Sequence, residues 1–291
     1  MKFENRIIDL QKAYEARKLG IYLNSTPFRT LPSLGNFLGG IPKGVCIGLT
    51  ADANVGKTPL AKNIAYNFYL AKKENPKINY QLIYFCLEEP REKFIDRLIT
   101  HFYYIKYGKY LDYPKLLSNS KNILSEQEWK EIDGIKIKVN NFLKYVTIVD
   151  DVYDPDTMYD ICLEHLSNNG RLVTEIKNNV RDIKSFVPHK LDSHICVITD
   201  HCNDLTGDKF GKGETFYAIE KWCRNYSARN LSKKANVTCF QVLQQALDKT
   251  QYTSKGKVVV SKLEPSKEGL GDNKQVYRSL DILLGLFAPS F

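Results

Sequence analysis

The residues most able to do chemistry occupy positions 51–58, where the chain reads Ala-Asp-Ala-Asn-Val-Gly-Lys-Thr. Glycine, lysine and threonine in this order, between an apolar strand and a helix, are typical of a loop that binds phosphate groups. The loop N–H groups surround the phosphate, Lys57 brings a positive charge to its oxygens, and the Thr58 hydroxyl can bind Mg²⁺. A chance match in a strand-turn-helix unit is the alternative. The sequence predicts a nucleotide-binding loop that consists of Ala51, Asp52, Ala53, Asn54, Val55, Gly56, Lys57 and Thr58.

Pro59 follows this loop directly and departs from the usual pattern. A proline fits the first turn of a helix, but it has no backbone N–H. A phosphate-binding loop normally offers the N–H at this position to the α-phosphate. We therefore expect a weaker or altered affinity for nucleotide.

Apolar stretches that end in acidic residues supply the other groups that phosphate chemistry needs. Residues 194–199 form one such stretch, and Asp200 follows it, where a carboxylate can hold Mg²⁺. The alternative is a strand that merely ends in a polar residue. A second stretch ends in Glu88 and Glu89, and a carboxylate there can orient and polarise an attacking water. Because His201 follows Asp200 where a glutamate is common, we assign the role of base to Glu88.

Glu89 and the glutamines near residue 244 have a second interpretation. Glu89 precedes Pro90, and a carboxylate there also suits the N-terminus of the helix expected near this proline. Gln244 and Gln245 follow the apolar stretch 237–243. A neutral amide at that point can sense a γ-phosphate and relay its loss to the next loop. A glutamine at a strand end is also an ordinary surface residue.

The elements that must position these residues alternate along the chain. Apolar stretches predict strands, and apolar side chains at helical spacing predict helices between them. Such alternation indicates an α/β fold with a mainly parallel sheet. The expected strands are 45–50, 81–87, 145–150, 195–199, 237–243 and 281–287, and the expected helices are 60–72, 91–104, 156–167 and 215–234, with further helices within 105–140.

Residues 3–22 place apolar side chains at helical spacing and predict an amphipathic helix ahead of the core. This helix either folds back on its own domain or docks on a neighbouring subunit. We expect residues 1–30 to form this helix and a linker, and residues 31–291 to form one catalytic domain.

Composition limits the class of protein. With 291 residues and 43% hydrophobic content, the chain can bury one large α/β core. We expect no membrane span and a soluble, cytoplasmic protein of a bacterial or phage-infected cell. The seven cysteines lack zinc-ligand spacing and are expected to be reduced and structural. The formal charge of +9 favours a nucleic-acid partner, although an AT-rich genome would also enrich lysine.

Together these residues resemble the ATPase domain of replicative hexameric helicases of the DnaB type, within the RecA-like superfamily. The resemblance extends in the same order over roughly residues 20–288. It implies a RecA-like P-loop NTPase core, preceded by a linker helix. The strand-end glutamate followed by Pro-Arg-Glu is its most discriminating part. The matching segments are 37–44, 51–58, 84–92, 195–200, 237–245 and 278–284.

The resemblance implies an enzyme that uses ATP and Mg²⁺. Lys57 and Thr58 would bind the phosphates and the metal, Asp200 would support the metal, Glu88 would activate water, and Gln244 would sense the γ-phosphate. The expected partners are single-stranded DNA, further copies of the chain in a ring that is a hexamer in this family, and a primase or helicase loader. The small size favours a phage or mobile-element protein acting in replication.

The family also places DNA-contacting loops after the strands that end at Asp200 and at Gln244. Here these loops are 203–214 and 247–257, which contain glycines, lysines and aromatic residues suited to stacking on bases. Two solvated loops with ordinary surface lysines are the alternative. The DNA-binding candidates are Lys209, Phe210, Lys212, Lys249, Tyr252, Lys255 and Lys257.

Helicases of this type also carry a helical domain ahead of the linker and basic residues, after the last core strand, that reach the neighbour's nucleotide. This chain offers no clear counterpart, and we therefore expect a shortened chain or a ring ATPase of low intrinsic activity. A rival interpretation is an ATP-controlled DNA-binding or accessory ring ATPase that unwinds nothing; a metabolic kinase is a weaker one. Possible substitutes for the basic residues are Lys262, Lys267, Lys274 and Arg278.

Overall fold

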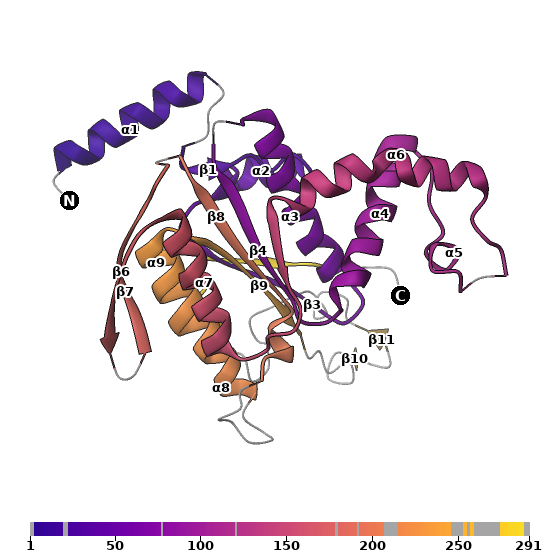
Figure 1. The fold of residues 1–291 in the computed structure, drawn as a ribbon. Coiled ribbons are helices and arrows are strands. Elements are labelled where there is room, and N and C mark those ends of the chain that lie inside the picture. Colours follow the sequence, from indigo (N-terminus) through magenta and orange to yellow (C-terminus); the bar gives the residue numbers. More distant parts are fainter. Residues whose placement is uncertain are drawn as a thin grey trace.

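Six parallel strands form the centre of the molecule (Figure 1). The computed structural model describes residues 3–19, 23–76, 78–119, 121–177, 180–190, 192–206, 215–245, 253–254, 257–258 and 274–287. The strand order is β12-β3-β9-β8-β4-β5, and every neighbouring pair is parallel. The expected α/β class with a mainly parallel sheet is confirmed. The strands are β3 (Cys46–Ala51), β4 (Tyr80–Cys86), β5 (Val146–Val149), β8 (His194–Asp200), β9 (Thr238–Gln244) and β12 (Ile282–Gly285).

The continuous apolar runs of the sequence form strands that are covered on both faces. Every residue of β3 and β8 is buried, as is typical of parallel strands between two helical layers. Along β4, Leu82 and Tyr84 enter one hydrophobic core, whereas Ile83 and Phe85 enter the other. This alternation follows from the two-residue period of a strand.

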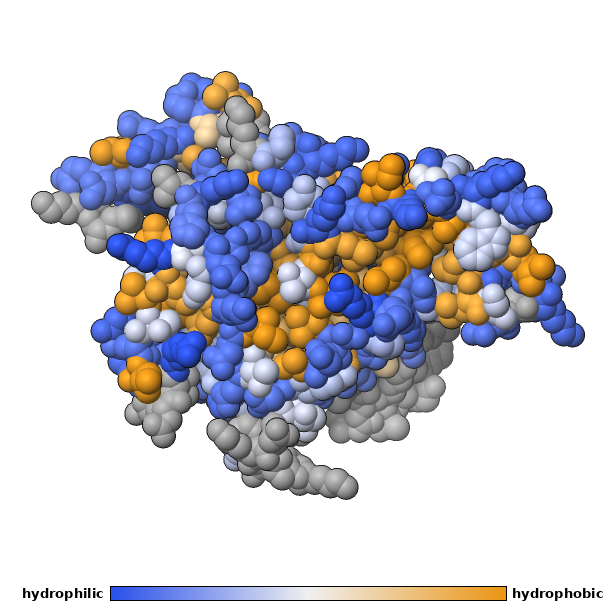
Figure 2. All heavy atoms as spheres, viewed as in Figure 1, coloured by the Kyte–Doolittle hydropathy of each residue, from blue (hydrophilic) through white to orange (hydrophobic). Residues whose placement is uncertain are grey.

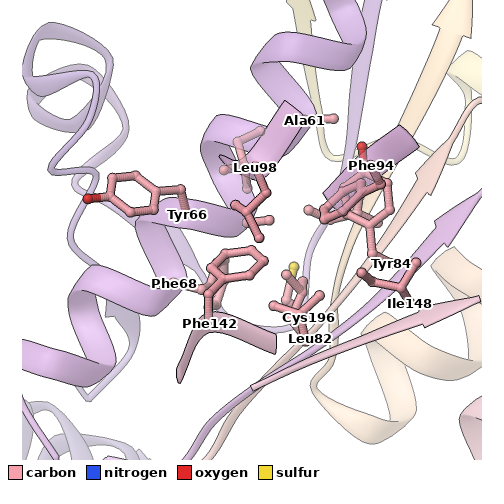
Figure 3. Packing of buried hydrophobic residues seen from close by; sticks show 14 of the residues in the cluster. Ala61, Tyr66, Phe68, Leu82, Tyr84, Phe94, Leu98, Phe142, Ile148 and Cys196 are labelled. Atoms are coloured by element: carbon pink, nitrogen blue, oxygen red, sulfur yellow. The ribbon is translucent and has the colours of Figure 1, made fainter. Parts of the chain in front are cut away.

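The first core lies between the sheet and helices α3 (Lys57–Glu74), α4 (Arg91–Tyr107) and α6 (Glu126–Leu143). Figure 3 shows its packing, with Phe94 beside Tyr84 of β4. Figure 1 shows α7, α8 and α9 on the opposite side of the sheet. The second core lies there, beneath α7 (Pro155–Asn169), α8 (Thr215–Glu220), the π-helix η2 (Lys221–Ser232) and α9 (Lys233–Ala235).

Strand register places the chemically interesting residues at one edge of the sheet. Ala51 pairs with Gln244 across β3 and β9, and Cys86 pairs with Asp200 across β4 and β8. The carboxyl ends of these four strands are therefore level with one another. Ligands of open parallel sheets bind beyond this edge.

A hairpin between α7 and β8 is absent from the sequence prediction. Its strands, β6 (Gly170–Lys177) and β7 (Val180–Pro188), pair antiparallel outside the central sheet (Figure 1). A bulge lies between Val173 and Thr174 and interrupts the alternation of side chains. The hairpin is therefore an antiparallel addition to the expected alternating order.

Helix α1 (Phe3–Lys18) lies away from the sheet (Figure 1). Of its side chains that the structure describes, none is buried, and Ile8, Leu10 and Tyr14 are exposed. The helix predicted over residues 3–22 thus forms, although residues 20–22 fall outside the described chain. Its apolar side chains do not enter the core described above.

The remaining elements are short. All seven cysteines are free and buried, as expected. No helix in the described part of the chain is long and apolar enough to cross a membrane. The short elements are β1 (Ser25–Thr26), α2 (Pro32–Leu38), β2 (Ile41–Pro42), α5 (Tyr113–Leu116), the 3₁₀ turn η1 (Cys202–Asp204), β10 (Thr253–Ser254), β11 (Lys257–Val258) and α10 (Lys274–Tyr277).

Candidate nucleotide site

The predicted phosphate loop connects the end of β3 to the start of α3. Ala51 ends the strand, and Lys57 is the first helical residue. Between them Asn54 has φ 61° and Gly56 has φ 104°. Asparagine and glycine tolerate this left-handed conformation better than other residues. The turn thus directs the N-terminus of an 18-residue helix, with its free N–H groups, at the space above the sheet edge.

Lys57 lies inside the loop, and its side chain folds over the loop backbone. The Nζ atom donates to the carbonyl oxygen of Asp52 at 2.8 Å and to that of Ala51 at 3.2 Å. The residue is only 7% exposed. Burial lowers the pKa of Lys57, while the charges of Glu88, Asp52 and Asp200 oppose that shift. An anion at the loop would add a further stabilising charge beside this ammonium group.

Two predicted carboxylates, Glu88 after β4 and Asp200 at the end of β8, meet at the Thr58 hydroxyl. Its Oγ1 lies 3.1 Å from Glu88 Oε2 and 3.1 Å from Asp200 Oδ1. The Tyr84 hydroxyl donates to the other Asp200 oxygen at 2.6 Å. Burial raises the pKa of Asp200, and these hydrogen bonds from Tyr84 and Thr58 oppose the shift. The strand-end register therefore brings Thr58, Glu88 and Asp200 into one cluster.

These oxygen atoms fit Mg²⁺. A hydroxyl and a nearby carboxylate are hard ligands, and Mg²⁺ commonly takes one or two protein oxygens together with phosphate oxygens and waters. Across the residues that the structure describes, no group of three or more His, Cys, Asp or Glu side chains could hold a metal ion alone. The donor set of Thr58 and Asp200 thus suits a metal that is shared with a nucleotide.

Gln244 reaches the same cavity from β9. Its backbone N–H donates to the Asn203 side chain at 3.0 Å, which ties the end of β9 to the turn after β8. The N–H of Gln245 donates to the carbonyl oxygen of Ala51 at 2.9 Å. The end of β9, where Gln244 lies, is thus hydrogen-bonded both to the turn after β8 and to the start of the phosphate loop.

A cavity of about 550 Å³ is lined by Lys57, Thr58, Glu88 and Gln244 and extends beyond them. It continues from the loop into the groove between α3 and α4, where Tyr66, Leu98 and Phe142 line it; Figure 3 shows these three side chains. Sequence reasoning missed the groove. Helical spacing could have indicated it. Residues four apart share a helix face, so Lys62 and Tyr66 of α3 could have been expected to line the same groove. The further lining residues from α4 include Lys93, Arg97 and His101.

Glu89 does not cap α4, contrary to one interpretation of the sequence. Pro90 is the N-cap residue and makes no side-chain cap bond, and the Arg91 N–H donates to Asp150. Glu89 instead forms a short ion pair with Lys62 from α3. Two further cations lie close to its other oxygen, Arg97 at 3.5 Å and Lys93 at 3.9 Å. One carboxylate with a side chain only 6% exposed thus lies among three cations.

The predicted DNA-binding residues are not described. Lys209, Phe210, Lys212, Lys249, Tyr252 and Lys255 lie outside the described residues, as do Lys262 and Lys267. For Lys257 in β11 and Lys274 in α10 only the backbone is described. Arg278 is exposed. The DNA-binding assignments therefore stay predictions.

Comparisons with known proteins support the fold. No protein-family model and no curated protein matches the sequence. Among solved structures, the chain is similar to a DnaB-like replicative helicase that was described with its interactions with primase. The TM-score is 0.63 and the identity 14%, over 97% of this chain and 56% of that helicase chain. The architecture is thus an α/β fold consistent with a RecA-like core and similar to that of a DnaB-like helicase.

Proposed function

We propose that this chain is an ATP-dependent DNA motor of the DnaB type, which couples Mg-ATP hydrolysis at subunit interfaces to movement on single-stranded DNA in replication. One observation carries the proposal: the Thr58 hydroxyl lies 3.1 Å from both the Glu88 and the Asp200 carboxylate. Lys57, the first residue of α3, lines the same cavity. These are the groups that hydrolysis of a γ-phosphate requires.

Each residue has a distinct task in this proposal. The Lys57 ammonium and the loop N–H groups bind and orient the phosphates. Glu88 orients the attacking water and accepts its proton, while Gln244 detects whether the terminal phosphate is present. Thr58 and Asp200 would hold Mg²⁺, which when bound neutralises charge on the phosphate oxygens. The α3–α4 groove would receive the rest of the nucleotide.

Exposed apolar surface supports assembly into a ring, for which we propose six copies. Ile7, Ile8, Leu10 and Tyr14 are exposed on α1, and Figure 2 shows apolar side chains on this helix and over the α4–α6 region. An amphipathic helix commonly docks into an apolar groove of its partner. We propose that α1 docks on the α4–α6 surface of the next copy. The exposed apolar residues of that surface are Tyr104, Ile105, Tyr110, Leu117, Ile123, Trp129 and Ile137.

The proposal extends to protein partners and source. The structurally similar DnaB-like helicase interacts with primase, so a primase or a helicase loader is the class of partner that we propose here. For the source we propose a phage or mobile element.

Steady-state ATP hydrolysis, measured with and without single-stranded DNA while light scattering records the mass of the particle, tests the proposal. We expect oligomers whose Mg²⁺-dependent turnover rises strongly with DNA. Turnover that is independent of DNA, or a monomer that binds nucleotide without turning it over, would contradict the motor.

A second function, an ATP-controlled DNA-binding or accessory ring ATPase without unwinding activity, is favoured by Pro59. This residue removes an N–H from the phosphate loop and so favours a slow switch over a fast motor. Displacement of a strand from a forked duplex separates the two. Unwinding in the presence of ATP supports the motor, and ATP-dependent DNA binding without unwinding supports the switch.

A further inference from the structure

The Lys62–Glu89 pair occupies the nucleotide cavity, yet neither residue has a part in the proposed hydrolysis. Both line the cavity together with Pro59, Lys93 and Arg97. The Lys62 side chain is only 16% exposed and pairs with Glu89. A lysine held in a nucleotide cavity, one helical turn from the Thr58 hydroxyl, calls for a physical explanation.

Helix geometry allows Lys62 to reach the phosphates. Residues four apart lie on the same face, so Lys62 follows Thr58 along the line that faces Glu88, Glu89 and the cavity. Side chains on a helix tilt toward its N-terminus and cover the preceding turn. The preceding turn here contains Thr58 and Pro59. The Lys62 ammonium can therefore reach the position that the N–H of residue 59 would occupy in a loop without proline.

We propose, resting on the proposed ATP-binding function, that Lys62 is a second phosphate-binding lysine and that it replaces the backbone N–H that Pro59 lacks. Its ligand is the α-phosphate of the bound nucleotide, with Glu89 as the alternative partner. A charged ammonium group supplies a stronger hydrogen bond than a backbone N–H. The proline at position 59 then removes one hydrogen-bond donor from the loop, and Lys62 supplies another donor to the nucleotide.

The surroundings of Glu89 make this exchange of partners feasible. A buried carboxylate that loses its one cation carries a large penalty. Glu89 Oε2 keeps Arg97 at 3.5 Å and Lys93 at 3.9 Å when Lys62 turns to a phosphate. The cluster has three cations for one carboxylate. When Lys62 moves away, Glu89 therefore still has two cations nearby. This surplus explains why Lys93 and Arg97 surround a carboxylate that Lys62 already contacts.

A double-mutant cycle between residues 59 and 62 tests the replacement. The affinity for a fluorescent non-hydrolysable ATP analogue is measured at fixed Mg²⁺ and ionic strength for the unmutated chain, Lys62→Gln, Pro59→Ala and the double variant. Glutamine keeps a donor for Glu89 but removes the charge. Lys73→Gln, an exposed position on the same helix, is the matched control. Thermal unfolding confirms that each variant folds.

The expected loss in Lys62→Gln is about tenfold in Kd, the weight of a charged hydrogen bond. In the Pro59→Ala background, where residue 59 again has an N–H, the same change should cost about threefold or less. Lys73→Gln should not alter Kd. An equal loss in both backgrounds would overturn the replacement, and an unchanged Kd in Lys62→Gln would overturn the phosphate contact. If the unmutated chain bound no analogue, the proposed function itself would fail and this inference with it.

Discussion

Lys57 in the nucleotide cavity and the cations at the β6–β7 hairpin meet their partners differently. On the hairpin, Glu175 accepts from Lys177 at 2.7 Å and from Lys184 at 2.6 Å, and Asp182 pairs with Lys234 at 2.6 Å. These bonds from Lys177 and Lys184 lower the pKa of Glu175 to about 2. The charges of the hairpin are therefore stabilised by one another.

At Lys57 and Asp200 the balance is reversed. Lys57 folds back on two carbonyl oxygens, and burial lowers its pKa. Burial likewise raises the pKa of Asp200. Charged forms that the fold disfavours are the ones that an added anion or cation would stabilise. At the hairpin the ion pairs stabilise the charged groups, whereas Lys57 and Asp200 are groups whose charged forms a bound nucleotide or metal ion would stabilise.

The largest expected effect is that of Lys57→Ala. In the proposed function Lys57 supplies the charge at the β- and γ-phosphates, so turnover of ATP should fall at least about a hundredfold. Burial of its ammonium group opposes the two hydrogen bonds that this group donates, so we expect its removal to change the unfolding temperature by less than about 3 °C. ATPase assays and thermal unfolding measure both. A clear loss of stability would break the contrast between the two regions.

Tyr84→Phe should have an intermediate effect. The Tyr84 hydroxyl donates to Asp200 at 2.6 Å and is fully buried, so it positions the carboxylate without touching the nucleotide. Its loss should lower turnover about tenfold and raise the Mg²⁺ concentration that gives half-maximal rate, as loss of an outer-shell partner does. Titration of the rate with Mg²⁺ checks this. An unshifted Mg²⁺ requirement would show that Tyr84 only fills the core.

As the pH falls, the contribution of His194 in β8 to the free energy of unfolding should be lost before that of Glu175 in the hairpin. His194 is fully buried between Thr26 and Thr238, and burial, helped by Lys43, holds its pKa well below the usual value. Below about pH 6.5, the unperturbed pKa of histidine, the unfolded chain therefore binds a proton at His194 that the folded chain does not bind. The free energy of unfolding is unaffected by this residue above about pH 6.5, and it decreases by up to about 1.4 kcal/mol for each pH unit below that value.

Unfolding of the chain and of His194→Gln between pH 7 and pH 5 measures this slope, which should be smaller in the variant. Burial also lowers the pKa values of His101 and His165, so part of the pH dependence should persist in the variant. The depressed pKa of Glu175 instead stabilises the fold above about pH 4.5, and that contribution is lost as the pH falls toward 2. Equal slopes in both proteins would contradict the assignment to His194.

The smallest effect is expected on the hairpin. Lys184→Gln removes one of two lysines that pair with Glu175 on an exposed surface. Such pairs contribute little, so the unfolding temperature should fall by less than about 2 °C and ATP turnover should not change. A marked loss of turnover would show that the hairpin has a functional role, and it would contradict the contrast between the hairpin and the cavity.

The sequence predicted the features that depend on local pattern. Continuous apolar runs indicated β3, β8 and β9, and the glycine, lysine and threonine of the loop indicated the phosphate site. Because strand ends in a parallel sheet are level, Glu88 and Asp200 could be expected near Thr58, as the structure has them.

The features that escaped prediction depend on tertiary placement. The Lys62–Glu89 pair depends on how closely the start of α4 approaches α3, and no local pattern encodes that approach. The β6–β7 hairpin lacks a regular alternation because of its bulge. The π-helical hydrogen bonding of η2 also has no distinct spacing of apolar residues, so the sequence indicated only a helix there.

The most direct test of the central claim compares Glu88→Gln with the unmutated chain. The glutamine keeps the size and the hydrogen bond to Thr58 but cannot accept a proton from water. Single-turnover hydrolysis and equilibrium binding of Mg-ATP are measured on the same preparations. We expect unchanged or tighter binding and a hydrolysis rate at least about a hundredfold lower. Hydrolysis at the unmutated rate would contradict Glu88 as the base and, with it, the assignment of this cluster as the hydrolytic site.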